Sequence, residues 1–142
     1  STFWTERVGP TAALKTLELM QKIKSWEIIS KKGIYFKQRL IKLGQKYELP
    51  LNVFGCDGIP SFNFQSKNNL KYKTLITQEM IKSNILASNV IYICVKHDLK
   101  KFDEYFDCLE LVFQKIAACE KGYNINKFLK SQVCHTTFQR LN

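Results

Sequence analysis

The two histidines of this sequence are the first residues to consider for catalysis. His97 is followed at once by Asp98, and His135 lies in the last ten residues. Because nucleophilic triads are assembled in space, spacing along the chain excludes neither a Ser-His-Asp nor a Cys-His site. A histidine at the end of an apolar run can also simply fix a turn. We expect that role for His97 and a solvent-exposed position for His135.

Three carboxylates in helical segments could form a pair for acid–base catalysis. Glu79 could pair with Glu110 or with Asp103, but nothing in their spacing favours a pair over solvated helix faces. The sequence contains no glycine-rich phosphate loop with a lysine and no dinucleotide-binding fingerprint. The residues alone therefore give no complete active site.

The cysteines argue against a metal centre. Five are present, an odd number, and no two have the Cys-x-x-Cys spacing. The cysteines and the two histidines form no four-ligand zinc pattern along the chain, so we expect no zinc site. Reduced thiols in a cytoplasmic protein are the expected state.

The first twenty residues carry the clearest chemical signal. A loop rich in hydroxyls and charges leads into Gly9-Pro10, and proline is well tolerated in a first helical turn. Leu14, Leu17 and Met20 then mark one apolar helix face. Since helix N-termini carry free N–H groups and partial positive charge, they suit phosphates and carboxylates. We expect this loop to be the part of the chain that contacts a ligand or an active site.

Composition indicates one globular domain. The chain has 142 residues, of which 45% are hydrophobic, and a net charge of +10 from 22 basic and 12 acidic side chains. No apolar run reaches the length of a membrane span, and no signal peptide is visible. The charge permits nucleic-acid binding, but no recognition motif is present, so we expect a solvated lysine-rich surface. The chain begins without methionine and reads as part of something longer.

Two long helices are predicted from apolar stripes. The first starts at Ser25 as N-cap and ends before Pro50, and the second starts at Asp98 and ends near Gly122. Gly33 lies on the first stripe, where another element could approach closely. The stripes are Trp26, Ile29, Gly33, Phe36, Leu40, Leu43, Tyr47 and then Leu99, Phe102, Phe106, Leu109, Phe113, Ile116.

The region between these helices predicts a small sheet. Asp57-Gly58, between two apolar runs, favours a hairpin with a type I′ turn. Residues 70–75 are predicted as extended and residues 77–84 as a short helix, and Val90 to Val95 as a buried central strand. A short helix is expected over residues 125–129. Helices on one face of a small antiparallel sheet give an α+β domain.

The opening segment, from Ser1-Thr-Phe-Trp-Thr-Glu-Arg-Val-Gly-Pro to Leu17, resembles class-III pyridoxal-phosphate (PLP)-dependent aminotransferases. It is most similar to the branch of glutamate-1-semialdehyde 2,1-aminomutase. The resemblance continues through Gly58-Ile-Pro-Ser-Phe62, residues 77–86, and the run from Tyr92 to His97. It implies the C-terminal domain of a fold-type I aminotransferase, with a three- to four-stranded antiparallel sheet covered by helices and preceded by a long linking helix.

This resemblance implies several further properties. Residues 1–24 would join a large cofactor domain, and residues 25–142 would form the small domain. Thr2 would reach across a homodimer to the PLP phosphate. The substrates would be small amino donors and acceptors, an amino acid or amino-aldehyde, and the reaction a transamination or an isomerase-type amino transfer. We expect a cytoplasmic protein without a membrane or nucleic-acid partner.

The departures from the family pattern matter as well. The Schiff-base lysine of the family lies upstream of the matching segment, so we expect these 142 residues to be inactive alone. Asn84 stands where the family has glycine, and asparagine tolerates the positive φ of such a turn. The alternative left open is a basic, non-enzymatic α+β domain for binding or dimerisation.

Overall fold

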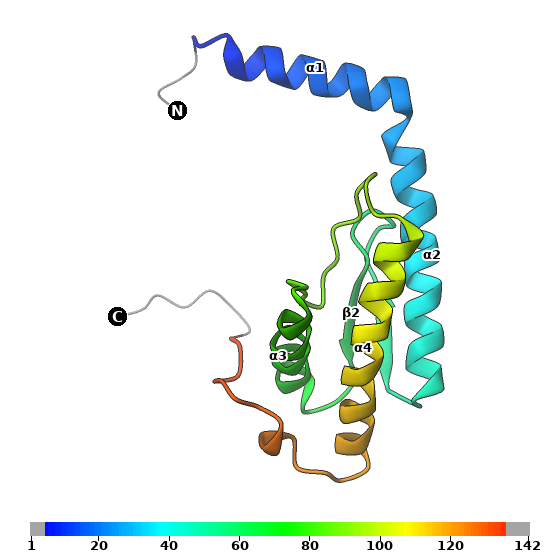
Figure 1. Ribbon diagram of the computed structural model, residues 1–142, viewed down its shortest axis with the longest axis vertical. Helices are drawn as coiled ribbons and strands as arrows, with labels where there is room; N and C mark the ends of the chain where they lie inside the picture. The colour runs from blue at the N-terminus through cyan, green and yellow to red at the C-terminus, as the bar shows by residue number, and fades with distance from the viewer. Residues whose placement is uncertain (1–4, 136–142) are drawn as a thin grey trace.

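A computed structural model describes residues 5–135 of the chain. Helices α2, α3 and α4 surround a β-hairpin, and α1 projects away from this body (Figure 1). The α+β class is therefore as predicted. The elements are α1 (Val8–Ile23), α2 (Ser25–Lys46), β1 (Leu51–Phe54), β2 (Ser61–Phe64), α3 (Asn69–Met80), α4 (Leu99–Glu120) and the 3₁₀ turns η1 (Ile81–Ser83) and η2 (Ile125–Lys127).

Helix α2 follows its predicted stripe, with Phe36, Leu40 and Leu43 in the core. Its predicted N-cap is wrong. Lys24, with φ of +49°, precedes the helix, and Ser25 is its first residue. Because a capping residue must lie outside the helix, the buried Ser25 hydroxyl cannot cap and has no hydrogen-bond partner.

Helix α4 has its predicted cap and follows its predicted stripe except at Leu99, which is exposed. The Asp98 side chain accepts a hydrogen bond from the Lys101 backbone N–H at 2.9 Å and so caps the helix. The apolar stripe faces the hairpin and α3, where the aromatic rings of Phe64, Tyr72 and Phe113 pack edge to face. The buried residues of α4 are Phe102, Phe106, Leu109, Val112, Phe113, Ile116 and Cys119.

The sheet has two strands, fewer than the three to four predicted. β1 and β2 pair in antiparallel register from Leu51 opposite Phe64 to Phe54 opposite Ser61. The predicted third strand runs beside β2 without forming a regular ladder. The Ile91 N–H donates to the Pro60 carbonyl at 2.9 Å, but proline has no N–H to complete the pair.

This segment is also less buried than predicted. Ile93 is in the core, but Tyr92 is 72% exposed and Cys94 is exposed. Only one side of the segment faces the core, so the prediction of a central strand buried on both faces is wrong. Its apolar residues instead contribute to an uncovered surface.

Two other local predictions need correction. The hairpin forms, and Ile59 N–H donates to the Cys56 carbonyl, but the positive φ lies at Gly55 (+86°) and not at Asp57 or Gly58. The turn is therefore not type I′. Residues 70–75 are helical, not extended, because Tyr72, Leu75 and Ile76 supply buried positions of α3 at helical spacing.

Candidate functional site

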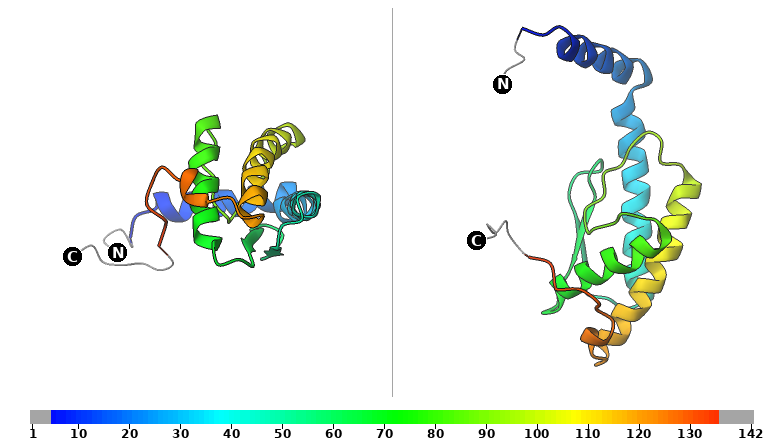
Figure 2. Two further views of the ribbon diagram at one scale, coloured as in Figure 1. Left: turned by 90° about the horizontal axis from the view of Figure 1, so that it is seen from below. Right: turned by 60° about the vertical axis from the view of Figure 1, so that its left-hand side comes forward.

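Helix α1 leaves an apolar surface uncovered. None of its residues is buried, and Leu14 and Leu17 are 64% and 60% exposed. Figures 1 and 2 show this helix directed away from the body, at a sharp bend where α2 begins. Soluble proteins rarely expose contiguous apolar patches, so such a face indicates a contact surface. The large apolar residues exposed on α1 are Val8, Leu14, Leu17, Leu19, Met20 and Ile23.

The start of α1 is open to an anion. Its first turn contains no acidic side chain, and no side chain caps it. A Cβ atom added at Gly9 would have nothing within 4 Å. Arg7 precedes the helix directly, and Glu6 and Arg7 form no ion pair with each other within residues 5–135. Thr2, the predicted phosphate ligand, lies outside the described residues.

The amino-terminal half of α2 fixes the loop between the two strands. A Cβ atom at Gly33 would lie 1.6 Å from the backbone oxygen of Asp57, which confirms the predicted close approach. Four residues on, the Lys37 ammonium donates to the Gly55 carbonyl at 2.7 Å and to the Asp57 carboxylate at 2.9 Å. These contacts hold the loop against the helix.

The same part of α2 fixes a second loop, which contains His97. The Lys32 ammonium donates to the Val95 carbonyl at 2.7 Å. The Cys94 N–H donates to Nδ1 of His97 at 3.3 Å, so this histidine fixes the turn as predicted. Partial burial, together with the charges of Lys32 and Lys101, lowers the pKa of His97. The imidazole is therefore a neutral acceptor near pH 7.

The carboxylates considered for acid–base catalysis each bind a cation instead of one another. Glu79 contacts the ammonium of Lys115 at 2.6 Å and that of Lys82 at 2.5 Å. Burial opposes ionisation of Glu79, but these hydrogen bonds outweigh it and lower its pKa to about 2. Glu110 contacts Lys46, and Asp103 contacts Arg39 in the same way. With a pKa this low, Glu79 is a poor proton donor or acceptor at neutral pH.

Other reactive groups of the described chain do not converge. Residues 5–135 contain no group of three or more His, Cys, Asp or Glu side chains that could hold a metal ion. The five cysteines are unpaired, and Cys119 is buried while Cys94 is exposed. None of the helices in the described part of the chain is long and apolar enough to cross a membrane. The described residues thus present surfaces and positioned loops and lack an assembled catalytic group.

A groove of about 410 Å³ lies where α2 meets the start of α4. Lys31 and Lys32 line one side, and Asp98 and Leu99 line the other. The ring of Tyr35 stacks on that of Phe102 within it, with the centroids 6.1 Å apart. Sequence reasoning missed this groove, because it joins two elements more than sixty residues apart; only the lysine-rich face of α2 pointed to it.

Comparison with known proteins identifies the fold. No protein-family model matches the chain. The chain is 28% identical over 102 residues to a 3-aminobutyryl-CoA aminotransferase of Cloacimonas acidaminovorans (strain Evry), which covers 68% of this chain and 25% of that protein. It also superposes on the PLP internal aldimine form of the FumI protein of Sphingopyxis sp. MTA144. That match has a TM-score of 0.76 and 16% identity, and covers 89% of this chain and 31% of the other.

These matches show an aminotransferase-like fold. The chain spans about a quarter of the length of the curated relative and about a third of the solved structure. In both of those proteins, most of the sequence lies outside the part that resembles this chain. The chain thus has the fold of one part of an aminotransferase.

Proposed function

We propose that this chain is the C-terminal small domain of a class-III PLP-dependent aminotransferase. Residues 1–24 would join it to the cofactor domain, and residues 25–142 would form the small domain. The observation that carries the proposal is the exposure of α1: this long helix has no buried residue, although the body that follows it is well packed. A helix of this composition needs an apolar partner, and a cofactor domain preceding the small domain provides one.

The residues at the start of α1 fit the phosphate of PLP. Arg7 supplies a positive charge, and the open first turn supplies N–H groups. We propose that Thr2 adds a hydroxyl donor to the phosphate of the cofactor held by the other subunit of a homodimer. When bound, PLP supplies the electron sink for breaking and forming bonds at an amino-bearing carbon. The lysine that holds it would come from the cofactor domain, so we expect the isolated chain to be inactive.

In such an enzyme, this chain would orient the substrate and keep water out of the active site. Helix α2 holds the loop at Asp57 and the loop at Val95 through Lys37 and Lys32. Both loops lie at the end of α2 nearest to α1 (Figure 1), and therefore on the side where the cofactor domain would dock. Fixed loops at a domain boundary can exclude water and orient a substrate without reacting themselves.

Amino transfer between two molecules is the reaction we favour. The curated relative is named as an aminotransferase acting on 3-aminobutyryl-CoA, and this supports an acyl-CoA carrying an amino group as the donor. Intramolecular transfer, as in the aminomutase branch, is the second candidate, supported by the likeness of residues 1–17. The two differ in one requirement, because only the aminotransferase needs a separate oxo-acid acceptor. We place the enzyme in the cytoplasm.

The test uses the protein expressed from the complete gene that encodes this chain. It should bind PLP and transfer an amino group from a 3-aminoacyl-CoA to an oxo acid. Replacing Thr2 by Val should weaken PLP binding, whereas Thr2→Ser should retain it, because only the serine keeps the hydroxyl donor. Absence of PLP binding by the complete protein would overturn the proposal. Salt-sensitive binding of an acidic partner without PLP would instead favour the basic binding domain.

A further inference from the structure

The groove between α2 and the start of α4 has the chemistry of a nucleotide site. Two lysines and a histidine line it beside exposed apolar and aromatic surface. Leu99 is 63% exposed and Tyr35 is 38% exposed, so a flat ring could lie on them. Lysine side chains at the edge of an aromatic surface suit a molecule with phosphates on one side and a base on the other.

The electrostatic balance of the groove is positive. Asp98 is the one carboxylate among its lining residues, and it is already engaged, because it caps α4 and contacts the Lys101 ammonium at 3.4 Å. Glu27, one turn before Lys31, contacts the Lys24 ammonium at 3.5 Å. Neither carboxylate contacts Lys31, which forms no ion pair within residues 5–135.

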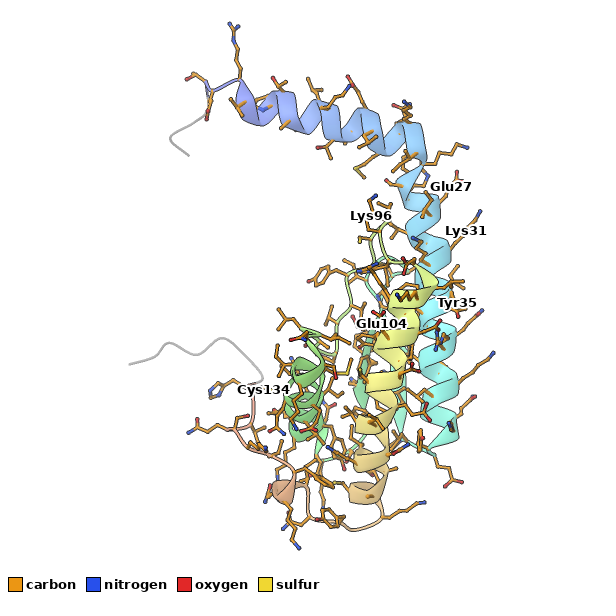
Figure 3. The ribbon with its side chains drawn as sticks, viewed as in Figure 1. Glu27, Lys31, Tyr35, Lys96, Glu104 and Cys134 are labelled. Atoms are coloured by element: carbon orange, nitrogen blue, oxygen red, sulfur yellow. The ribbon has the colours of Figure 1, made fainter. Side chains whose placement is uncertain are left out.

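Two further lysines, Lys96 and Lys100, are sequence neighbours of residues that line this groove. Figure 3 shows Lys31 and Tyr35 on α2, and Lys96 at the tip of the loop that Lys32 holds at Val95. Lys100 follows in the first turn of α4. Burial is the main cause that lowers the pKa of His97, and the charges of Lys32 and Lys101 lower it further. Of the two lysines that line the groove, Lys32 donates to the Val95 carbonyl, so Lys31 is the one available to a phosphate.

We infer that this groove binds the nucleotide end of an acyl-CoA substrate. The adenine would lie against Tyr35 and Leu99, and the phosphates would contact Lys31 and the lysines around it. The inference rests on the proposed function, since the CoA thioester enters through the named substrate of the curated relative. The site would bind and position the substrate at its unreactive end, remote from the amino group that is transferred.

The experiment measures CoA binding to the 142-residue chain by titration calorimetry, without PLP. Lys31→Glu should weaken binding by about tenfold, because it replaces a phosphate contact by repulsion. Lys67→Glu is the matched control: Lys67 is an exposed lysine in the loop before α3, and its replacement makes the same change in net charge. Tyr35→Leu should weaken binding by at least about fivefold through loss of stacking. Circular dichroism verifies that each variant is folded.

Competing ligands separate the possible sources of the signal. Adenosine 3′,5′-bisphosphate should compete with CoA, whereas pantetheine and inorganic phosphate at equal concentration should not. Undetectable CoA binding, or equal weakening by Lys31→Glu and Lys67→Glu, would overturn the inference. So would tighter binding of a single-stranded oligonucleotide than of CoA, which would identify a nucleic-acid surface. Because PLP takes no part, these outcomes are independent of whether the complete protein transfers amino groups.

Discussion

Replacing Gly33 by alanine should destabilise the fold more than any other single methyl group added to a glycine of this chain. The new Cβ would lie 1.6 Å from the Asp57 oxygen and 2.5 Å from its carbonyl carbon. An ordinary carbon–oxygen contact needs about 3.3 Å, so the loop must retreat by roughly 1.7 Å. Both atoms belong to the backbone, and no side-chain rotation can relieve the overlap.

The magnitude follows from what that movement disrupts. Overpacking of this kind costs about 1–3 kcal/mol. The retreating loop also loses Lys37 hydrogen bonds to Gly55 and Asp57, each worth about 0.5–1.5 kcal/mol. Alanine returns about 1 kcal/mol of helix propensity. We therefore expect a net loss between about 1 and 5 kcal/mol, centred near 3 kcal/mol.

Urea unfolding followed by circular dichroism measures this loss. With a denaturant slope of about 2 kcal/mol/M, a loss of about 3 kcal/mol should lower the midpoint by about 1.5 M. Gly9→Ala is the control, because a Cβ there meets nothing within 4 Å; its midpoint should stay close to that of the wild type. A Gly33→Ala midpoint equal to or above the wild-type value would refute the close approach of the loop to α2.

Three further predictions concern single side chains. Glu79→Gln should cost about 2–3 kcal/mol at pH 7. Because the folded-state pKa of Glu79 is lowered to about 2, the stability of the wild type should fall as the pH drops from about 5 towards 2. A variant whose stability falls with pH as that of the wild type does would contradict the ion pair with Lys115. Asp98→Ala should lower the midpoint of thermal unfolding through loss of the cap, whereas Asp98→Asn should keep the midpoint close to that of the wild type, because asparagine also caps. Asn84 has φ of +60°, so Asn84→Gly should leave stability nearly unchanged, whereas Asn84→Val should destabilise the fold by about 1–2 kcal/mol. Equal urea midpoints for these two variants would contradict this backbone conformation.

The parts of the fold that could be predicted depend on local pattern. The Asp98 cap and the stripe of α4 from Phe102 to Ile116 can be recognised from residue type and spacing along the chain, and both are confirmed. Gly33 stood out because it interrupts an apolar stripe, and its partner is a backbone segment, as expected. The positive φ of Asn84 was also predictable from residue type.

The errors have their source in tertiary structure. The run from Val90 to Val95 has strand composition and forms an isolated antiparallel bridge with β2. Pro60 has no N–H to donate to it, and the segment does not become a regular third strand. Residues 70–75 resembled a strand in isolation, but their burial against α4 makes them helical. Ser25 resembled a cap, but the left-handed Lys24 already separates α1 from α2.

The candidate site was less predictable than the fold. The turn-fixing role of His97 could be anticipated from its place after an apolar run. The groove between α2 and α4 could not, because its lysines and its apolar surface come from segments that only the fold brings together. The exposed face of α1 was visible as a pattern, although the sequence does not show whether such a face is covered.

The visible absorbance spectrum of the protein from the complete gene tests most directly the proposal that this chain completes a PLP enzyme. We predict a band from PLP bound to a lysine of the cofactor domain, which changes when an amino donor is added. Leu17→Lys on the uncovered face of α1 should reduce that band in the complete protein, since the charge would disrupt the domain contact. A complete protein that neither contains PLP nor takes it up on reconstitution would contradict the account.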